Sequence, residues 1–445
     1  MSKKNILKGT LILTVAGLAT KLLGFYNRIF LTRLIGVKEI GVYQLIFPLY
    51  MLAFSLSCQG ISITLTKQIA YYFGSKKTKN AKQVFILGTA IACTISIFLA
   101  FIIYSFSNTI SYYILKNIEC APLLKILSIA IPFVSVKACI NAFFVGVDRP
   151  MFQGISHFIE QIFRIGITYV LSLLWSTDRL NAKAAVIAVV FGEIAATILA
   201  LFCYSLTRKD YFGKSENNIR NISEKNDRKE IINLFVKDSV PITINNVLLT
   251  LFSSLEAIIL PSMLYSYYLN GEKALEIFGM ITGIVIPFLL FPATITTSLS
   301  TMLLPAVSYA KAKKDDKTIS QVLRNSMFFC ITLGVFSWIF YNLCGEFVCQ
   351  FTFNNKIAGS LLAKIGFLCP LIYIAGNLSA ILNGIGKTFN NLIYHVISII
   401  IRIMFTVLLV PNYGVTAYVA GMTISYVILD ILMVFSVKPD KNYSS

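Results

Sequence analysis

Long apolar blocks are the feature that most constrains what this chain can fold into. Stretches of about twenty residues or more, with few charges inside them, recur along the whole sequence. A helix of that length crosses a hydrocarbon core of about 30 Å, and it satisfies its own backbone hydrogen bonds inside lipid. The sequence therefore predicts an all-α polytopic membrane protein.

Composition and span count agree with this fold class. The 445 residues are 56% hydrophobic and only 13% charged, whereas soluble proteins carry about 25% charged residues. Twelve spans can be drawn, and some, such as the second, must tilt or extend beyond the bilayer. They cover residues 7–31, 40–70, 83–106, 122–146, 154–175, 184–206, 233–263, 277–309, 319–343, 361–385, 391–410 and 414–436.

The net charge of +19 is interpreted as a topology signal. In a soluble protein such an excess would suggest nucleic acid as a partner. Here the basic residues of the short loops fall 22 on one side and 7 on the other. The positive-inside rule assigns the richer side to the cytoplasm. We therefore expect a multi-pass protein of the cell membrane with both termini cytoplasmic and with no nucleic acid partner.

An internal repeat relates the two halves of the chain. A shift of 238 residues pairs 41–165 with 279–403 without a gap, and 24 of these 125 pairs are identical. Such self-similarity indicates a repeat architecture. Each half holds six spans, so both halves enter the membrane from the same side and the repeats are parallel. Transporters built in this way place the substrate cavity between the halves.

The repeat suggests a division into two helical domains joined by a polar segment. We expect an N-terminal six-helix bundle over 1–206, a C-terminal six-helix bundle over 233–437 and a cytoplasmic tail over 438–445. The intervening residues 207–232 are rich in Lys, Asn and Glu and lack hydrophobic periodicity, which is typical of a solvated linker. Its charge could instead bind anionic lipid headgroups.

The stretch ISHFIEQIFRI at 155–165 carries the most unusual polar residues. It recurs as IYHVISIIIRI at 393–403, which places Arg164 and Arg402 at equivalent positions. A charged side chain at the bilayer centre costs about 2.5–3.5 kcal/mol on insertion scales, so a repeated arginine indicates a function. His157 and His395 are also equivalent, and we expect them to pack or to lie at the interface rather than to titrate.

Glu160 stands four residues before Arg164, the favourable order for an ion pair on one helical face. Such a pair could bind a substrate, or it could merely make the helix tolerable in lipid. Arg402 has Ser398 where Arg164 has Glu160. It therefore needs a partner from another helix, from water or from a ligand.

Four further ionisable residues within the spans complete the candidate site. Arg28 and Lys137 could bind an anion, although Arg28 could equally contact lipid headgroups. Glu193 and Glu256 could be countercharges or proton carriers for ion coupling, with ion pairing between helices as the simpler alternative. The span 277–309 contains Pro287, Pro292 and Pro305, which predict either a broken helix that lines a cavity or a static kink.

No catalytic motif stands out, so we do not expect an enzyme. The sequence lacks HExxH, a nucleophile elbow and a phosphate-binding glycine loop, and its nine cysteines have no ligand spacing. We predict neither a cofactor nor a metal site, and we expect the cysteines to act as small hydrophobic residues. An intramembrane enzyme that uses scattered carboxylates is the alternative.

The two six-helix repeats, the stretch TKLLGFYNRIFLTRLIGVKEIGVYQL and the EQxxR of 160–164 together resemble a known family. They look like the stage V sporulation protein B and polysaccharide-export (Wzx- and MurJ-like) branch of the multidrug/oligosaccharidyl-lipid/polysaccharide (MOP) exporters. The resemblance implies a MATE-like fold and transport of undecaprenyl-pyrophosphate-linked sugars. It also implies that Arg28 and Arg164 occupy basic cavity positions, to which the internal repeat adds Arg402. Many members of the branch have fourteen spans, whereas twelve are drawn here.

These observations predict a flippase for a lipid-linked saccharide or a lipid II-like precursor. Arg28, Arg164 and Arg402, helped by Lys137, would bind the pyrophosphate, because a guanidinium donates bidentate hydrogen bonds and stays protonated. Glu160 would orient Arg164. Membrane lipids are expected partners, and envelope-synthesis enzymes are possible ones. A MATE-type cation-coupled antiporter and a non-transporting scaffold for cell-wall or spore-envelope synthesis are the alternatives; the antiporter would need acidic cavity residues, which the first span lacks.

Overall fold

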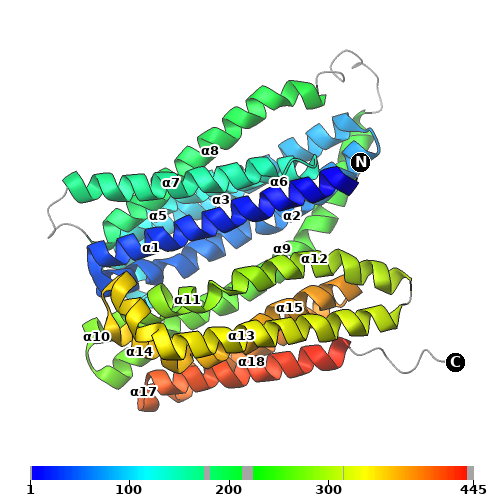
Figure 1. Cartoon of the computed structure of the whole chain (residues 1–445). Helices are drawn as coiled ribbons and strands as arrows, with labels where there is room; N and C mark the ends of the chain where they lie inside the picture. The colour runs from blue at the N-terminus through cyan, green and yellow to red at the C-terminus, as the bar shows by residue number, and fades with distance from the viewer. Residues whose placement is uncertain (1–2, 175–180, 213–223, 314, 438–445) are drawn as a thin grey trace. The chain divides into compact units, whose positions relative to one another are not determined.

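The computed structural model describes residues 3–174, 181–212, 224–313 and 315–437. Within these ranges every regular element is a helix (Figure 1), which confirms the predicted all-α fold class. The elements are α1 (Lys3–Phe54), η1 (Ser55–Gln59), α2 (Gly60–Gly74), α3 (Thr78–Ser105), α4 (Ser107–Thr109), η2 (Ile110–Ile114), α5 (Cys120–Ser128), α6 (Ala130–Gly146), α7 (Met151–Leu174), α8 (Ala182–Phe212), α9 (Glu224–Tyr268), α10 (Gly271–Gly279), η5 (Met280–Val285), α11 (Ile286–Leu290), α12 (Ala293–Ala312), α13 (Asp316–Phe353), α14 (Lys356–Ile365), η6 (Gly366–Leu368), α15 (Cys369–Ile385), α16 (Thr388–Leu408), α17 (Val410–Tyr413) and α18 (Val415–Val437).

Ten helices of the described chain are long and apolar enough to cross a membrane. The predicted spans 7–31 and 40–70 are not separated by a loop, because helix runs from Lys3 through a kink at Gly36 to Gly74. The segment from Ala19 to Gly74 therefore counts once. Helix α7 matches the predicted span 154–175 but is not among the ten, because its polar residues lower its hydropathy. The difference from twelve thus lies in these two places.

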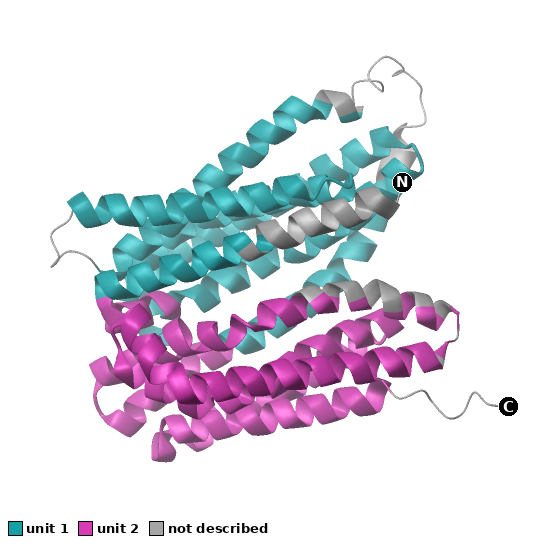
Figure 2. Cartoon of the chain, in the orientation of Figure 1, with its two compact units in different colours: residues 1–35, 45–254 teal, residues 36–44, 255–445 magenta. Residues whose placement is uncertain are grey.

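Contacts divide the chain into two compact units (Figure 2). Unit 1 comprises residues 1–35 and 45–254, and unit 2 comprises 36–44 and 255–445. Helix α8 extends into the predicted linker as far as Phe212, and helix α9 begins within that linker at Glu224. The remainder of that linker and the predicted tail 438–445 lie outside the described residues. The domain assignment 1–206 and 233–437 stays a prediction.

Unit 1 has an aromatic and aliphatic core between α2, α3 and α6. Leu65, Phe85 and Phe143 are almost fully buried there. The ring centroids of Phe85 and Phe143 lie 5.2 Å apart, within the range of favourable aromatic pairs. This core holds α6 in place, and α6 carries one of the charged residues of the site.

Unit 2 contains a close crossing of repeat-related segments. A methyl group on Gly41 would lie closer than 3.0 Å to the carbonyl oxygen of Leu275, and one on Gly279 equally close to that of Val37. Val37 and Leu275 are 238 residues apart, the same offset that relates the two glycines in the internal repeat. The crossing is therefore reciprocal, as expected where a twofold relation brings equivalent segments together.

The predicted span 277–309 is a broken helix. It divides into the end of α10, the π-helical segment η5, the short α11 and α12, with a turn at Phe291 and Pro292. Proline cannot donate the backbone hydrogen bond that would continue the helix, which explains the break before α12.

Candidate functional site

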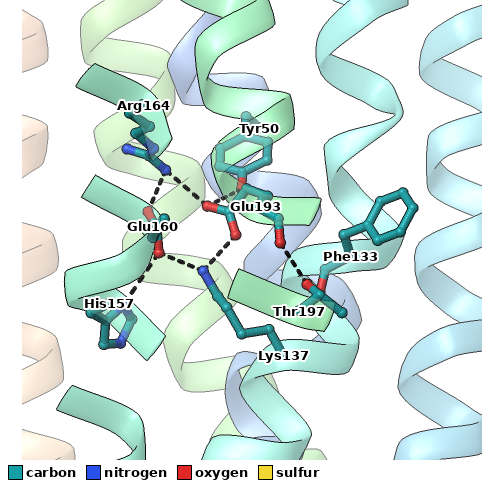
Figure 3. Close-up of polar contacts among 8 residues, drawn as sticks. All are labelled: Tyr50, Phe133, Lys137, His157, Glu160, Arg164, Glu193 and Thr197. Carbon is teal, nitrogen blue, oxygen red and sulfur yellow. Dashed lines mark hydrogen bonds and ion pairs between the residues drawn. The ribbon is translucent and has the colours of Figure 1, made fainter. Parts of the chain in front are cut away.

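Four helices of unit 1 bring a cluster of ionisable side chains together (Figure 3). Helix α6 supplies Lys137, α7 supplies Glu160 and Arg164, and α8 supplies Glu193. Tyr50 reaches the cluster from α1, where its hydroxyl donates to Glu193 Oε1 over 3.4 Å. The cluster thus joins residues that lie far apart in the sequence.

The charged groups form a closed ring of alternating sign. Lys137 Nζ donates to Glu160 Oε2 over 2.6 Å and to Glu193 Oε2 over 2.5 Å. Arg164 Nη2 closes the ring with Glu160 Oε1 at 2.5 Å and Glu193 Oε1 at 2.9 Å. Two cations and two carboxylates give a formal charge of zero, with each cation shared between both acids.

Local sequence explains how α7 and α8 contribute three of the four members of this ring. Glu160 and Arg164 are four residues apart, so they share one face of α7. Helix α7 packs along α8, and Gly192 makes room for Arg164. A methyl group on Gly192 would lie 2.7 Å from Arg164 Cγ. Thr197 Oγ1 fixes α8 against α6 by donating to the carbonyl of Phe133 over 2.9 Å.

The ring is mostly buried, and its most exposed member, Arg164, lies on the same open side as the neighbouring His157. The side chains of Lys137, Glu160 and Glu193 are at most 7% exposed, whereas Arg164 is 17% exposed and the neighbouring His157 is 44% exposed. His157 Nδ1 lies 3.3 Å from Glu160 Oε2. A ligand entering from the open side would therefore meet Arg164 and His157 before the acids behind them.

This open side is a pocket of about 530 Å³ within unit 1. The charged ring and His157 line one part of it. The amides Asn141 and Gln153 and the aromatic rings of Phe47, Tyr50 and Phe54 line other parts. Pockets of this size and mixed lining are typical of sites for small molecules or headgroups.

Unit 2 contains the second predicted arginine in a simpler arrangement. Arg402 on α16 pairs with Glu256 on α9 over 3.1 Å. The Tyr418 hydroxyl donates to Glu256 over 3.5 Å, and the Arg402 guanidinium lies 5.6 Å from the centre of the Tyr426 ring. His395 makes a 2.9 Å hydrogen bond with the Ser379 hydroxyl. The prediction that Arg402 needs a partner outside its own helix is confirmed.

The structure brings together three of the five predicted substrate-binding residues, namely Lys137, Glu160 and Arg164. It places both ion-coupling candidates, Glu193 and Glu256, as countercharges of arginines. Arg28 is partly exposed on α1, its carbonyl accepts from the Thr32 hydroxyl at 2.8 Å, and it is not among the described residues that line the pocket. Substrate binding by any of these residues stays a prediction.

Sequence reasoning missed the contributions of Tyr50, Gly192 and His157. Tyr50 and Gly192 carry no signal of their own in one sequence. Their roles come from the hydrogen bond of Tyr50 to Glu193 and from the packing of α7 against α8. The spacing of His157 and Glu160, three residues apart, was a usable signal for their contact.

The described residues contain no group of three or more His, Cys, Asp or Glu side chains that could hold a metal ion. The charges of the ring itself suit it to bind ions. Arginine, lysine and histidine can bind an anion, and carboxylates can take up protons or bind a cation.

Similar proteins cover nearly the whole chain. A family model described as "Polysaccharide biosynthesis protein" matches residues 6–311. Stage V sporulation protein B of Bacillus subtilis is 23% identical over 442 residues, covering 97% of this chain and 83% of the relative. Lipid II flippase MurJ of the same organism is 18% identical over 465 residues, covering 100% and 84%. A solved inward-facing multidrug resistance MATE family transporter of the MOP superfamily has a TM-score of 0.70 at 14% identity, covering 96% of both chains.

Proposed function

The chain belongs to the polysaccharide biosynthesis protein family, and from this premise we propose that it is a flippase for a lipid-linked saccharide. Its relatives and its MATE-like fold make it a membrane transporter of the MOP superfamily. The cargo is our proposal: an undecaprenyl-pyrophosphate-linked saccharide or a lipid II-like precursor. A relative that is named a lipid II flippase supports this cargo class.

The observation that carries the proposal is the charged ring beside the 530 Å³ pocket of unit 1. A buried site with no ligand must neutralise its cations, because an unpaired buried charge is very costly. Glu160 and Glu193 supply that neutralisation. A pyrophosphate can replace one carboxylate at Arg164. A planar carboxylate and a tetrahedral phosphate group are both oxyanions that accept two hydrogen bonds from a guanidinium.

Partner exchange at Arg164 suits transport better than permanent tight binding. The anion accepts charge-assisted hydrogen bonds from Arg164 when it binds. The displaced carboxylate accepts these bonds again when the anion leaves. Neither state leaves Arg164 unpaired, so the barrier to release stays low. Outward movement of a negative charge across an inside-negative membrane also releases about 2.3 kcal/mol per charge at 100 mV.

The remaining candidate residues are proposed in supporting roles. Lys137 is held between both carboxylates, and it would reach the anion only after the ring opens. Arg28 and Arg402 would offer further cationic positions to the headgroup. Glu193 and Glu256 would be the groups through which an ion could be coupled, and both termini would be cytoplasmic. Enzymes of envelope synthesis would supply the cargo.

Transport in liposomes tests this function. Purified protein is reconstituted with a fluorescent lipid that carries a pyrophosphate-linked sugar, and its translocation is followed by quenching from outside. Arg164→Ala should reduce the rate about ten- to hundredfold, since a hydrogen bond to a charged group contributes about 1.5–3 kcal/mol. Lys364→Ala, which removes an exposed cation of α14, is the control and should leave the rate unchanged.

The same liposomes discriminate between the alternatives. The carboxylates of the ring are the observation that favours a cation-coupled antiporter. Uptake of ethidium with no lipid translocation would support that function and contradict ours. A chain that moves neither compound would be a scaffold.

A further inference from the structure

We propose that His157, in its protonated form, is a direct ligand of the substrate's phosphate, so that anion binding at the ring is linked to proton uptake. The inference rests on the proposed function, because the pyrophosphate is the anion concerned. It assigns a binding role to His157, for which the sequence suggested only packing or a position at the interface.

His157 has the position that such a ligand needs. It lines the 530 Å³ pocket, and with 44% of its side chain exposed it is far more accessible than the carboxylates behind it. Its Nδ1 lies 3.3 Å from Glu160 Oε2, and an ionised carboxylate can only accept. The proton is therefore on Nδ1, and Nε2 makes no hydrogen bond to any described residue. When protonated, Nε2 becomes a second donor that can reach a ligand in the pocket.

The charge balance of the site explains why His157 would take up a proton when the anion binds. The groups around His157 are Glu160 and Arg164 on its own helix, Lys137 from α6, Glu193 from α8 and the Tyr50 hydroxyl from α1. The four charged groups among them sum to zero, so a pyrophosphate diester would bring two uncompensated negative charges. Histidine is the side chain whose ordinary pKa allows it to gain a charge between pH 5 and 8. A protonated His157 offsets one of these charges, and Glu160 accepts its Nδ1 proton in either state.

The internal repeat supplies a matched control. His395 occupies the equivalent position of the second half, but its partner is the Ser379 hydroxyl rather than a carboxylate. The chain has only these two histidines. Two substitutions, His157→Gln and His395→Gln, can therefore show which imidazole causes a pH dependence of ligand affinity near neutral pH.

The experiment measures binding of a short-chain polyprenyl pyrophosphate linked to one N-acetylhexosamine. Both phosphates of this diester keep their charge between pH 5.5 and 8, so a change in affinity reports on the protein. We expect the wild type and His395→Gln to bind about tenfold more tightly at pH 5.5 than at pH 8, since one additional charge-assisted hydrogen bond contributes about that factor. The direction follows from the sign: the protonated imidazole attracts the anion, and this attraction is lost as pH rises. His157→Gln should bind with the lower affinity at both pH values.

Imidazole NMR signals of the full-length protein in nanodiscs give a second readout that does not depend on the folding of His157→Gln. In His395→Gln the single remaining signal is that of His157, and the ligand should extend its protonated form to higher pH. Unchanged titration with the ligand bound, or pH-dependent affinity that persists in His157→Gln, would overturn the inference. If the wild type binds the lipid equally tightly at pH 5.5 and pH 8, only the role of His157 fails. If it binds no pyrophosphate lipid at any pH, the proposed function fails as well.

Discussion

At the scale of single residues, the ring of unit 1 depends on Glu193 more than on any other member. Glu193 accepts from Lys137, Arg164 and Tyr50, which come from three different helices. Without its charge, two buried cations share one carboxylate. Removal of one partner from a buried ion pair typically costs about 3–5 kcal/mol.

We therefore expect Glu193→Gln to lower the free energy of unfolding by about 3 kcal/mol or more. The measurement is denaturant unfolding of the protein in mild detergent. Glu346→Gln is the control, since Glu346 is half-exposed and pairs with Lys356 at 3.5 Å on the surface. Exposed pairs contribute about 0–1 kcal/mol. Equal effects of the two substitutions would show that the ring is not a buried network.

The pair of Arg402 and Glu256 in unit 2 makes a separate prediction. Glu256→Gln leaves the Arg402 guanidinium without its 3.1 Å partner and should destabilise the protein by about 3–5 kcal/mol. Glu256→Gln combined with Arg402→Met removes both charges and should recover most of that loss. A double-mutant cycle of unfolding free energies measures the coupling. Additive effects would mean that the two side chains are not paired in the folded protein.

At the scale of helices, the reciprocal glycine crossing of unit 2 is the tightest test of the packing. A side chain at Gly41 or Gly279 would overlap the opposite backbone. Gly41→Ala and Gly279→Ala should each cost about 1–3 kcal/mol, the usual effect of overpacking. Gly376→Ala on α15 is the matched control, because nothing lies within 4 Å of an added methyl group there. This control should be neutral or slightly stabilising, since alanine is the better helix former. Thermal unfolding of the three variants compares them.

The helices themselves were predictable from the sequence, whereas the site was predictable only in part. Apolar block length gives most of the spans, and their limits follow from the polar loops that flank them, whereas the first two predicted spans form one continuous kinked helix. The kink at Gly36 and the π-helical segments were not predictable, because they depend on packing between segments distant in sequence. The contact between Glu160 and Arg164 was predictable from their spacing in α7. Glu193, the ring member on α8, was only a candidate. A single sequence does not show toward which neighbouring helix the Glu193 side chain points.

At the scale of the whole molecule, the parallel repeat and the cytoplasmic termini are predictions that one experiment can test. The positive-inside rule assigns the Lys76–Lys82 loop to the cytoplasm and the region before α5 to the exterior. A parallel repeat requires the equivalent positions of the second half to lie on the same sides, whereas an inverted repeat would exchange them.

Four exposed positions sample these loops, namely Lys77 and Glu119 in the first half and Lys317 and Ile357 in the second. Each is changed to cysteine in a background that lacks the nine native cysteines, and intact cells are treated with a membrane-impermeant maleimide. Glu119→Cys and Ile357→Cys should be labelled from outside, and Lys77→Cys and Lys317→Cys only after the membrane is permeabilised. Labelling of Glu119→Cys together with Lys317→Cys would mean that the second half is inverted. If only Lys77→Cys and Lys317→Cys are labelled in intact cells, both termini lie outside. The excess of basic residues in the loops on that side then does not set the orientation.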